Sequence, residues 1–132
     1  MIFVDTSFWA AVRNRRDDHH PGAVSLLQRY GGEPFVTTNH VRGETWTLLR
    51  RRVGHASAVD FLNGIQRSPR VQIEFVGPDI EEDAVRWLRR HDERAYSFVD
   101  ATSFLVMRDL KIADVLSFDS DFSAVGFRQL SP

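Results

Sequence analysis

The strongest constraint on the fold is the alternation of short apolar runs with longer segments whose apolar residues recur at helical spacing. The run at residues 1–4 is typical of a buried strand, and the segment 17–30 carries Ala23, Leu26 and Leu27 on one helical face. Strands that alternate with helices favour a parallel sheet with helices on both faces. We therefore predict an α/β fold.

The predicted elements continue in this order along the chain. We expect strands at residues 1–4, 35–37, 71–76, 114–118 and 127–130, and helices at 17–30, 39–53, 56–67, 79–90 and 98–110. A further helix follows the first strand, with Thr6 or Ser7 as its N-cap. A chain of 132 residues without a linker or repeat fits one domain, 1–132.

The absence of cysteine removes several kinds of chemistry. A chain with 0 Cys has no disulfides, no thiolate metal ligands and no cysteine nucleophile, and it fits a reducing compartment. The first residues lack the basic region and long apolar run of a signal peptide, and no apolar stretch reaches the length of a membrane span. We expect a cytoplasmic protein without membrane contact.

The overall charge is unlike that of most nucleic-acid-binding proteins, because the net charge is only -1. All the basic residues except Lys111 are Arg, however, and Arg is the better bidentate ligand for phosphate. Genomic base composition is an alternative reason for this bias. Lys111 lies in a predicted surface turn, so Schiff-base chemistry is not expected.

Five acidic residues stand in apolar surroundings, where an ionised carboxylate needs a partner. They are Asp5, Glu44, Asp100, Asp119 and Asp121. Asp5 ends the first strand, and Asp119 and Asp121 follow the fourth. Ligand sites in parallel sheets lie beyond the carboxyl ends of the strands, so we expect these acids at one edge.

Each of these acids also has a purely structural explanation. Asp5 could cap a helix, Asp100 could cap or hydrogen-bond internally, and Asp119 could form an Asx-turn. Glu44 could pair with a nearby Arg. The joint pattern favours a shared cation instead, because clustered carboxylates repel one another. Oxygen ligands select Mg²⁺ or Mn²⁺, and the lack of Cys and of a His-x-x-x-His pair argues against zinc.

Four motifs follow one another along the chain: Val4-Asp5-Thr6-Ser7, Glu44 within a helix, Phe98-Val99-Asp100-Ala101, and Ser117-Phe118-Asp119-Ser120-Asp121-Phe122. In this order they resemble the motifs of the PIN-domain family, and more narrowly those of the VapC toxins of bacterial VapBC pairs. The resemblance covers essentially the whole chain. It departs at Ser117, where many relatives carry Thr, but the hydroxyl is kept.

The resemblance implies a three-layer α/β/α sandwich with a central parallel sheet of four to five strands. It implies Mg²⁺, with Mn²⁺ as a substitute, bound by Asp5, Glu44, Asp100 and Asp119, with Asp121 as a candidate fifth acid. Thr6 or Ser7 would orient the first Asp or a water on the metal. The implied activity is endonucleolytic cleavage of structured RNA, in tRNA or rRNA loops, which inhibits translation.

The implied partners are the RNA substrate, a VapB-like antitoxin that often inserts an Arg into the acidic pocket, and a second copy of the chain in a homodimer. An acidic pocket needs basic residues around it to hold RNA. We expect this role for Arg13, Arg15 and Arg16, in a loop near Asp5, and for Arg50; solvated surface is the alternative for all four.

Three other residues near the acids have less specific patterns. His40 precedes Glu44 by four residues and could face the same side of its helix. Trp9 follows Asp5 by one turn and could line the pocket or a dimer contact. Trp46 is expected in the core or in the dimer interface.

Three alternative functions remain at the level of sequence. A catalytically silent PIN-like RNA- or protein-binding module is disfavoured because no core acid is missing. A receiver-type phosphoacceptor domain needs an acidic neighbour for Asp5 and a later Lys than Lys111. A DNA or flap nuclease of the wider superfamily usually has more acids and larger insertions than this minimal chain.

Overall fold

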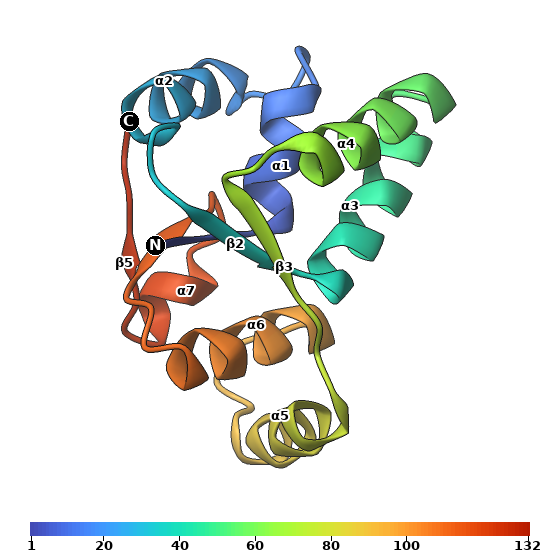
Figure 1. Ribbon diagram of the computed structural model, residues 1–132. Helices are drawn as coiled ribbons and strands as arrows, with labels where there is room; N and C mark the ends of the chain where they lie inside the picture. Colours follow the sequence, from blue (N-terminus) through green and yellow to red (C-terminus); the bar gives the residue numbers. More distant parts are fainter.

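A five-stranded parallel sheet forms the centre of the molecule (Figure 1). The computed structural model describes residues 1–132. The strands are β1 (Ile2–Val4), β2 (Phe35–Thr38), β3 (Val71–Glu74), β4 (Asp114–Leu116) and β5 (Arg128–Gln129). Their order is β3-β2-β1-β4-β5, and every neighbouring pair is parallel. The predicted parallel sheet is confirmed.

Helices cover both faces of this sheet and give three layers. They are α1 (Thr6–Arg13), α2 (His20–Tyr30), α3 (Asn39–Arg52), α4 (His55–Arg67), α5 (Pro78–Arg90), α6 (Phe98–Asp109) and α7 (Asp121–Ala124). Figure 1 shows α1 to α4 on one side of the sheet and α5 to α7 on the other. None of these helices combines the length and the hydropathy that a membrane span requires.

The strand order places a topological switch point between β1 and β4. From β1 the chain adds β2 and β3 on one side, whereas β4 and β5 extend the sheet on the other side. Connections that leave adjacent strands in opposite directions open a crevice at the carboxyl ends of those strands. Asp5 follows β1 and Asp119 lies beyond β4, so the fold brings both to this crevice.

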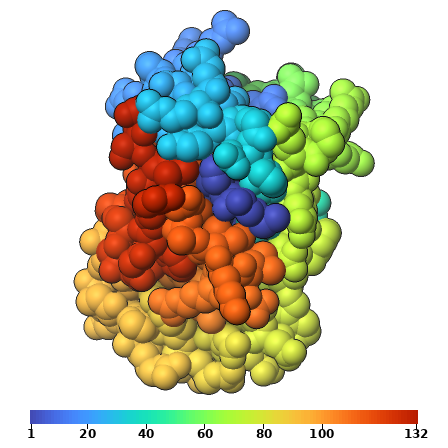
Figure 2. Space-filling view, turned by 60° about the vertical axis from the view of Figure 1, so that its left-hand side comes forward, coloured from blue at the N-terminus to red at the C-terminus, as the bar shows by residue number.

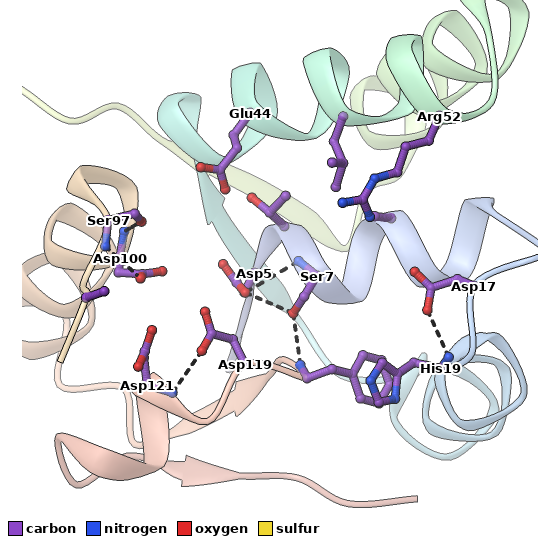
Figure 3. A pocket seen from close by; sticks show the side chains of 15 residues that line it. Asp5, Ser7, Asp17, His19, Glu44, Arg52, Ser97, Asp100, Asp119 and Asp121 are labelled. Atoms are coloured by element: carbon purple, nitrogen blue, oxygen red, sulfur yellow. Dashed lines mark hydrogen bonds between the residues drawn. The ribbon is translucent and has the colours of Figure 1, made fainter.

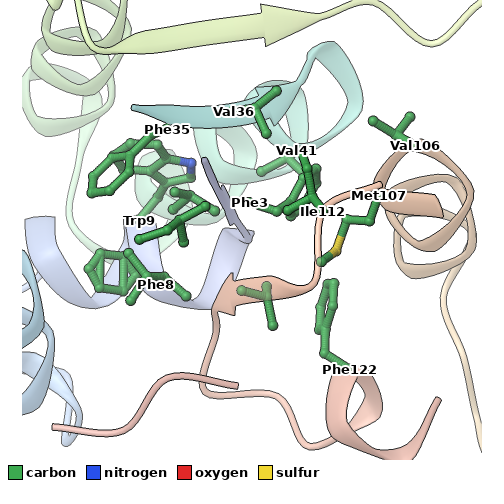
Figure 4. Packing of buried hydrophobic residues seen from close by; sticks show 14 of the residues in the cluster. Phe3, Phe8, Trp9, Phe35, Val36, Val41, Val106, Met107, Ile112 and Phe122 are labelled. Carbon is green, nitrogen blue, oxygen red and sulfur yellow. The ribbon is translucent and has the colours of Figure 1, made fainter. Parts of the chain in front are cut away.

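The hydrophobic core lies between the sheet and the helices (Figure 4). All three residues of β1 are buried, which explains its uninterrupted apolar sequence. Trp9 belongs to this core: its ring packs against Phe35 and Phe61, and its indole nitrogen donates to Thr37 Oγ1 at 3.4 Å. Trp9 therefore does not line the cavity that contains the acids, which was one of the two places predicted for it.

The opposite end of the sheet carries the amino terminus. Figure 2 shows the N-terminal residues in the middle of one face, between the segments around β2 and β4. Met1 is exposed there and lines a shallow hollow with Lys111 and Asp114. Lys111 lies in a turn with a positive φ of 56°, as its predicted place in a surface turn suggested.

Two helix starts and one short helix differ from the sequence-based predictions. Asp5, rather than Thr6 or Ser7, is the N-cap of α1, because its carboxylate accepts the amide of Ser7. α2 starts at His20, since residues 17–19 form a turn held by the Asp17 carboxylate. The four-residue α7 is too short to produce a periodic pattern.

Candidate active site

A cavity of about 490 Å³ lies at the carboxyl ends of β1 and β4 (Figure 3). Its wall includes all five acids that the sequence singled out, contributed by segments far apart in the chain. These are Asp5, Glu44, Asp100, Asp119 and Asp121. The five acids thus line one cavity, as predicted from their places in the sequence.

Asp5 is fixed by both the sheet and the helix that it joins. Its amide donates to Leu116 O at 3.1 Å, and its side chain is only 4% exposed. Oδ2 accepts hydrogen bonds from Ser7 N at 3.4 Å, Ser7 Oγ at 3.0 Å and Ser117 Oγ at 2.9 Å. Oδ1 has no protein donor. Capping uses one oxygen and leaves the other for a ligand.

Two serine hydroxyls connect Asp5 to the loop after β4. Ser7 Oγ lies 3.1 Å from Ser117 Oγ and accepts the amide of Phe118 at 2.9 Å. Ser117 Oγ also accepts the amide of Asp119 at 3.0 Å. In the sequence, Ser117 stood out only as a departure from the family pattern, because its contact with Asp5 depends on the fold.

The other three aspartates repeat the pattern of one fixed and one free oxygen. In a capping box at the start of α6, Asp100 Oδ2 accepts the amide of Ser97 at 3.0 Å. Asp119 Oδ1 accepts the amide of Asp121 at 3.0 Å. Asp121 Oδ1 pairs with Arg94 Nε at 2.6 Å. The second oxygen of each of these three carboxylates accepts no hydrogen bond within the protein.

Three of the carboxylates approach one another closely enough to share an ion. Asp100, Asp119 and Asp121 each offer an oxygen within 4.8 Å of the other two. Asp5 and Glu44 line the same cavity outside this trio, and the Glu44 side chain is exposed. All of these donors are carboxylate oxygens, which fit a hard divalent cation.

Burial and mutual repulsion raise the pKa of three of these acids, Asp5, Asp100 and Asp119, when no cation is present. Burial raises the pKa of Asp5 to about 6, against the opposing hydrogen bonds from Ser117 and Ser7. Burial, with the charges of Asp5 and Asp119, raises the pKa of Asp100 to about 7. The pKa of Asp119 is raised mainly by burial and also by Asp121. A bound cation would reverse these shifts.

Comparison with known proteins assigns the family. A PIN domain profile matches residues 2–128. The chain is a PIN-domain protein of the VapC type. It is 54% identical over 132 residues to the 23S rRNA-specific endonuclease VapC20 of Mycobacterium tuberculosis, covering 100% of this chain and 99% of that one. It is 31% identical over 125 residues to a VapC ribonuclease of Archaeoglobus fulgidus, covering 91% and 78% of the two chains.

A solved structure agrees with this assignment. The crystal structure of M. tuberculosis VapC20, described as a sarcin-ricin loop cleaving toxin, superposes with a TM-score of 0.93 at 53% identity and 100% coverage of both chains. This VapC-type chain is therefore a nuclease with the three-layer PIN fold. Membership of the PIN family excludes the receiver-type domain.

The basic residues of this VapC-type chain are arranged differently from the prediction. Arg13, Arg15, Arg16 and Arg52 line a surface groove beside the cavity. The Arg13 guanidinium lies directly above the backbone of Gly64 in α4, where a Cβ would collide with it. From the Arg run at the end of α3, Arg52 lines the cavity, whereas the predicted Arg50 is exposed and does not.

His40 also lies elsewhere than its spacing from Glu44 suggested. Its Nε2 faces Glu81 at 3.4 Å and its Nδ1 lies 3.4 Å from Thr102 Oγ1. These contacts place His40 between α5 and α6, and it does not line the cavity. Trp46 packs against the core and against His55, which agrees with its predicted core position.

The cavity wall contains residues that the sequence analysis did not assign to the site. These are Asp17, His19, Arg52 and Phe118, together with small or apolar residues. The alternation of Phe118 with the neighbouring acids was a usable signal, because a residue between Ser117 and Asp119 necessarily lies at the crevice.

Proposed function

We propose that this chain is the toxin of a type II toxin–antitoxin pair and acts as a Mg²⁺-dependent endoribonuclease, with Mn²⁺ as a substitute. Its proposed target is a structured loop of ribosomal RNA, and cleavage there would inhibit translation. The observation that carries the proposal is the set of four aspartates that each keep one oxygen fixed by the protein and one oxygen free. Such an arrangement is preorganised for a cation.

The proposed ligands are Asp5, Asp100 and Asp119, with Asp121 and Glu44 completing the set directly or through solvent. A divalent cation in this position lowers the pKa of a bound water and stabilises negative charge on phosphate. Ser7 and Ser117 orient Asp5, and the capping box at Ser97 orients Asp100. These contacts reduce the reorganisation that binding would otherwise require.

Thr6 and Ser7 have different proposed roles. Ser7 donates directly to Asp5, so it orients this carboxylate. The Thr6 hydroxyl is buried at the cavity wall and has no protein partner. A buried hydroxyl without a partner is costly, so we assign Thr6 to a contact with solvent or substrate bound in the cavity.

The proposed substrate rests on the relatives. Similarity to VapC20 extends over the full chain, and that protein is named as a 23S rRNA-specific endonuclease and a sarcin-ricin loop cleaving toxin. This supports ribosomal RNA rather than tRNA as the proposed substrate of the present chain, and we propose that it acts in the cytoplasm, where ribosomes work. The groove formed by Arg13, Arg15, Arg16 and Arg52 supplies cations beside the acidic cavity, as RNA binding requires.

The proposed protein partners are a VapB-like antitoxin and a second copy of the chain. Membership of the VapC family supports both proposals. Phe75, which is 66% exposed at the end of the edge strand β3, provides an apolar contact for either partner. We propose that each copy folds as one domain. Light scattering on the isolated chain tests the homodimer, and a monomer at micromolar concentration would contradict it.

The central test uses a synthetic RNA hairpin with the sarcin–ricin loop sequence. We expect one cut in Mg²⁺, no cut in EDTA, and loss of the cut in Asp100→Asn. The matched control is Asp109→Asn, which neutralises an exposed acid at the far end of the same helix. Binding of the hairpin without cleavage in Mg²⁺ or Mn²⁺ would instead support the silent RNA-binding module.

A further inference from the structure

The end of the cavity farthest from Asp100 and Asp121 contains His19, Phe118 and Arg52 (Figure 3). We propose that this end is a nucleotide subsite, in which an unpaired base stacks on His19 and an adjacent phosphate binds Arg52. The inference rests on the proposed function, because it assigns the part of that site which holds RNA beside the scissile bond.

Three aromatic rings form a continuous stack from the core to the cavity. Phe8 is fully buried, and its ring lies 6.1 Å from that of Phe118 with an interplanar angle of 17°. The Phe118 ring lies 4.4 Å from the His19 ring at 6°. His19 is exposed and is the last ring of the series. A base can extend the stack, because every base offers a flat face to an aromatic ring.

The stack is held in a fixed relation to the acidic end. The carboxylate of Asp17 accepts the amide of His19 at 2.8 Å, which fixes the turn before α2. The amide of Phe118 donates to Ser7 Oγ, and the same hydroxyl donates to Asp5. Ser7 therefore connects Phe118, on which His19 stacks, to the proposed metal ligand Asp5. A base stacked on His19 would thus have a defined position relative to the acidic end of the cavity.

Arg52 is the one Arg or Lys that lines the cavity, and it stands among several carboxylates. Its side chain reaches into the cavity from the last residue of α3 (Figure 3). It forms no salt bridge, in contrast to Arg94, which is bound to Asp121. Arg52 also lines the basic groove of Arg15 and Arg16, so it joins the cavity to the surface along which RNA would approach. A guanidinium in this position suits a phosphate.

Together these contacts recognise a nucleotide that is outside a base-paired helix. A paired base has its faces covered by neighbouring bases and cannot reach His19 without unstacking. The subsite thus gives a physical reason for cleavage in a loop. Stacking on an aromatic ring tolerates every base. Removal of the His19 ring should therefore weaken RNA binding and slow cleavage without changing which base is preferred.

The first test compares two histidine variants in cleavage of the sarcin–ricin hairpin. His19→Ala should lower kcat/KM by about tenfold or more, whereas His19→Phe, which keeps a flat ring, should stay within about threefold of wild type. His91→Ala is the matched control, because His91 stacks on Trp87 at 4.0 Å and 17° but does not line the cavity. Wild-type kcat/KM in His19→Ala would overturn the proposal.

The second test asks whether His19 and a base act on each other. Each nucleotide flanking the mapped cut is replaced in turn by an abasic residue. At one position the abasic replacement should lower the kcat/KM of the wild-type enzyme by about tenfold. The same replacement should cause little further loss in His19→Ala, which already lacks the stacking ring. Equal abasic penalties in wild type and His19→Ala at every position would show that no base contacts this ring.

A binding measurement separates this inference from the choice of RNA. If the hairpin is not cut by the wild-type protein, the proposed function fails, but the subsite can still be tested without cleavage. In NMR titrations, millimolar guanosine or adenosine monophosphate should shift the ring protons of His19 more than ribose 5-phosphate does, and Arg52→Gln should weaken both. Absence of a His19 shift with either mononucleotide would overturn the subsite.

Discussion

The two ends of the cavity are built in different ways. At the acidic end, Asp5 and Asp100 sit at the starts of helices, and hydrogen bonds within the protein fix one oxygen of each. At the other end, His19 belongs to a turn and Arg52 has no protein partner. The sheet topology therefore sets the position of the acidic end, whereas a turn and a helix end form the part of the cavity that we propose binds RNA.

The largest effect should follow from removing charge at the acidic end. Asp5→Asn should lower kcat at least about a thousandfold, because the free oxygen of this carboxylate would lose its charge at the reaction centre. Circular dichroism should show an intact fold, since Asn can still accept from Ser7 and Ser117. Cleavage within tenfold of wild type would mean that the acidic end is not the reaction centre.

A smaller effect should follow from loosening Asp5 without altering its charge. Ser117→Ala removes a hydrogen bond of 2.9 Å to Oδ2, and we expect a loss of about tenfold to a hundredfold in metal affinity or activity. Ser117→Thr keeps the hydroxyl and serves as the conservative control. Equal activity in the Ala and Thr variants would show that this hydroxyl does not position the carboxylate.

The raised pKa values at the acidic end predict how the metal-free protein responds to pH. The pKa of Asp5 is about 6 and that of Asp100 is about 7, whereas the pKa of an Asp in an unfolded chain is near 4. Between the unfolded and the folded pKa of each group, the folded state therefore binds more protons than the unfolded state. The contribution of these groups to stability is therefore present at low pH and is lost as pH rises through 6 to 7.

Thermal unfolding in EDTA tests the direction of this change of stability with pH. The metal-free wild-type protein should lose more Tm between pH 5.5 and pH 8 than Asp100→Asn does, and Mg²⁺ should raise the Tm more at pH 8 than at pH 5.5. The comparison with Asp109→Asn separates this effect from that of general surface charge. Identical pH profiles for wild type and Asp100→Asn would contradict the burial of this carboxylate.

The smallest effect is expected on the basic side, where each contact is exposed. Replacing Arg15 and Arg16 by Gln should weaken RNA binding severalfold. It should also reduce the slope of log Kd against log salt concentration by up to about two, which corresponds to the loss of about two phosphate contacts. Arg50→Gln is the matched control, because Arg50 is exposed but lies outside the groove and the cavity. An unchanged salt slope in the Arg15 and Arg16 variant would remove the groove from the account.

The sequence could predict the acidic end because strand ends determine it. Once the apolar runs show a parallel sheet, Asp5 and Asp119 must lie at its carboxyl edge. Asp100 was recognised because it lies in the first turn of a strongly apolar helix. Even the competing explanation of Asp5 as a helix cap was correct, because one carboxylate can cap with one oxygen and bind with the other.

The end of the cavity that contains His19 and Arg52 could not be predicted in the same way. Successive helix residues are rotated by about 100°, so choosing Arg52 over Arg50 requires the orientation of α3, which is set by tertiary packing. The position of His19 depends on a turn closed by the Asp17 carboxylate. Ser117 carries only a hydroxyl, and its bond to Asp5 spans 112 residues of sequence.

Calorimetry of Mn²⁺ binding at pH 7.5 tests the cation site without any RNA. It compares the wild-type chain with Asp5→Asn, Asp100→Asn and Asp109→Asn. If the carboxylates form one preorganised cation site, wild type and Asp109→Asn should bind with the same Kd, and each of the other two variants should bind at least about tenfold more weakly. Equal affinity in all four proteins would contradict the site.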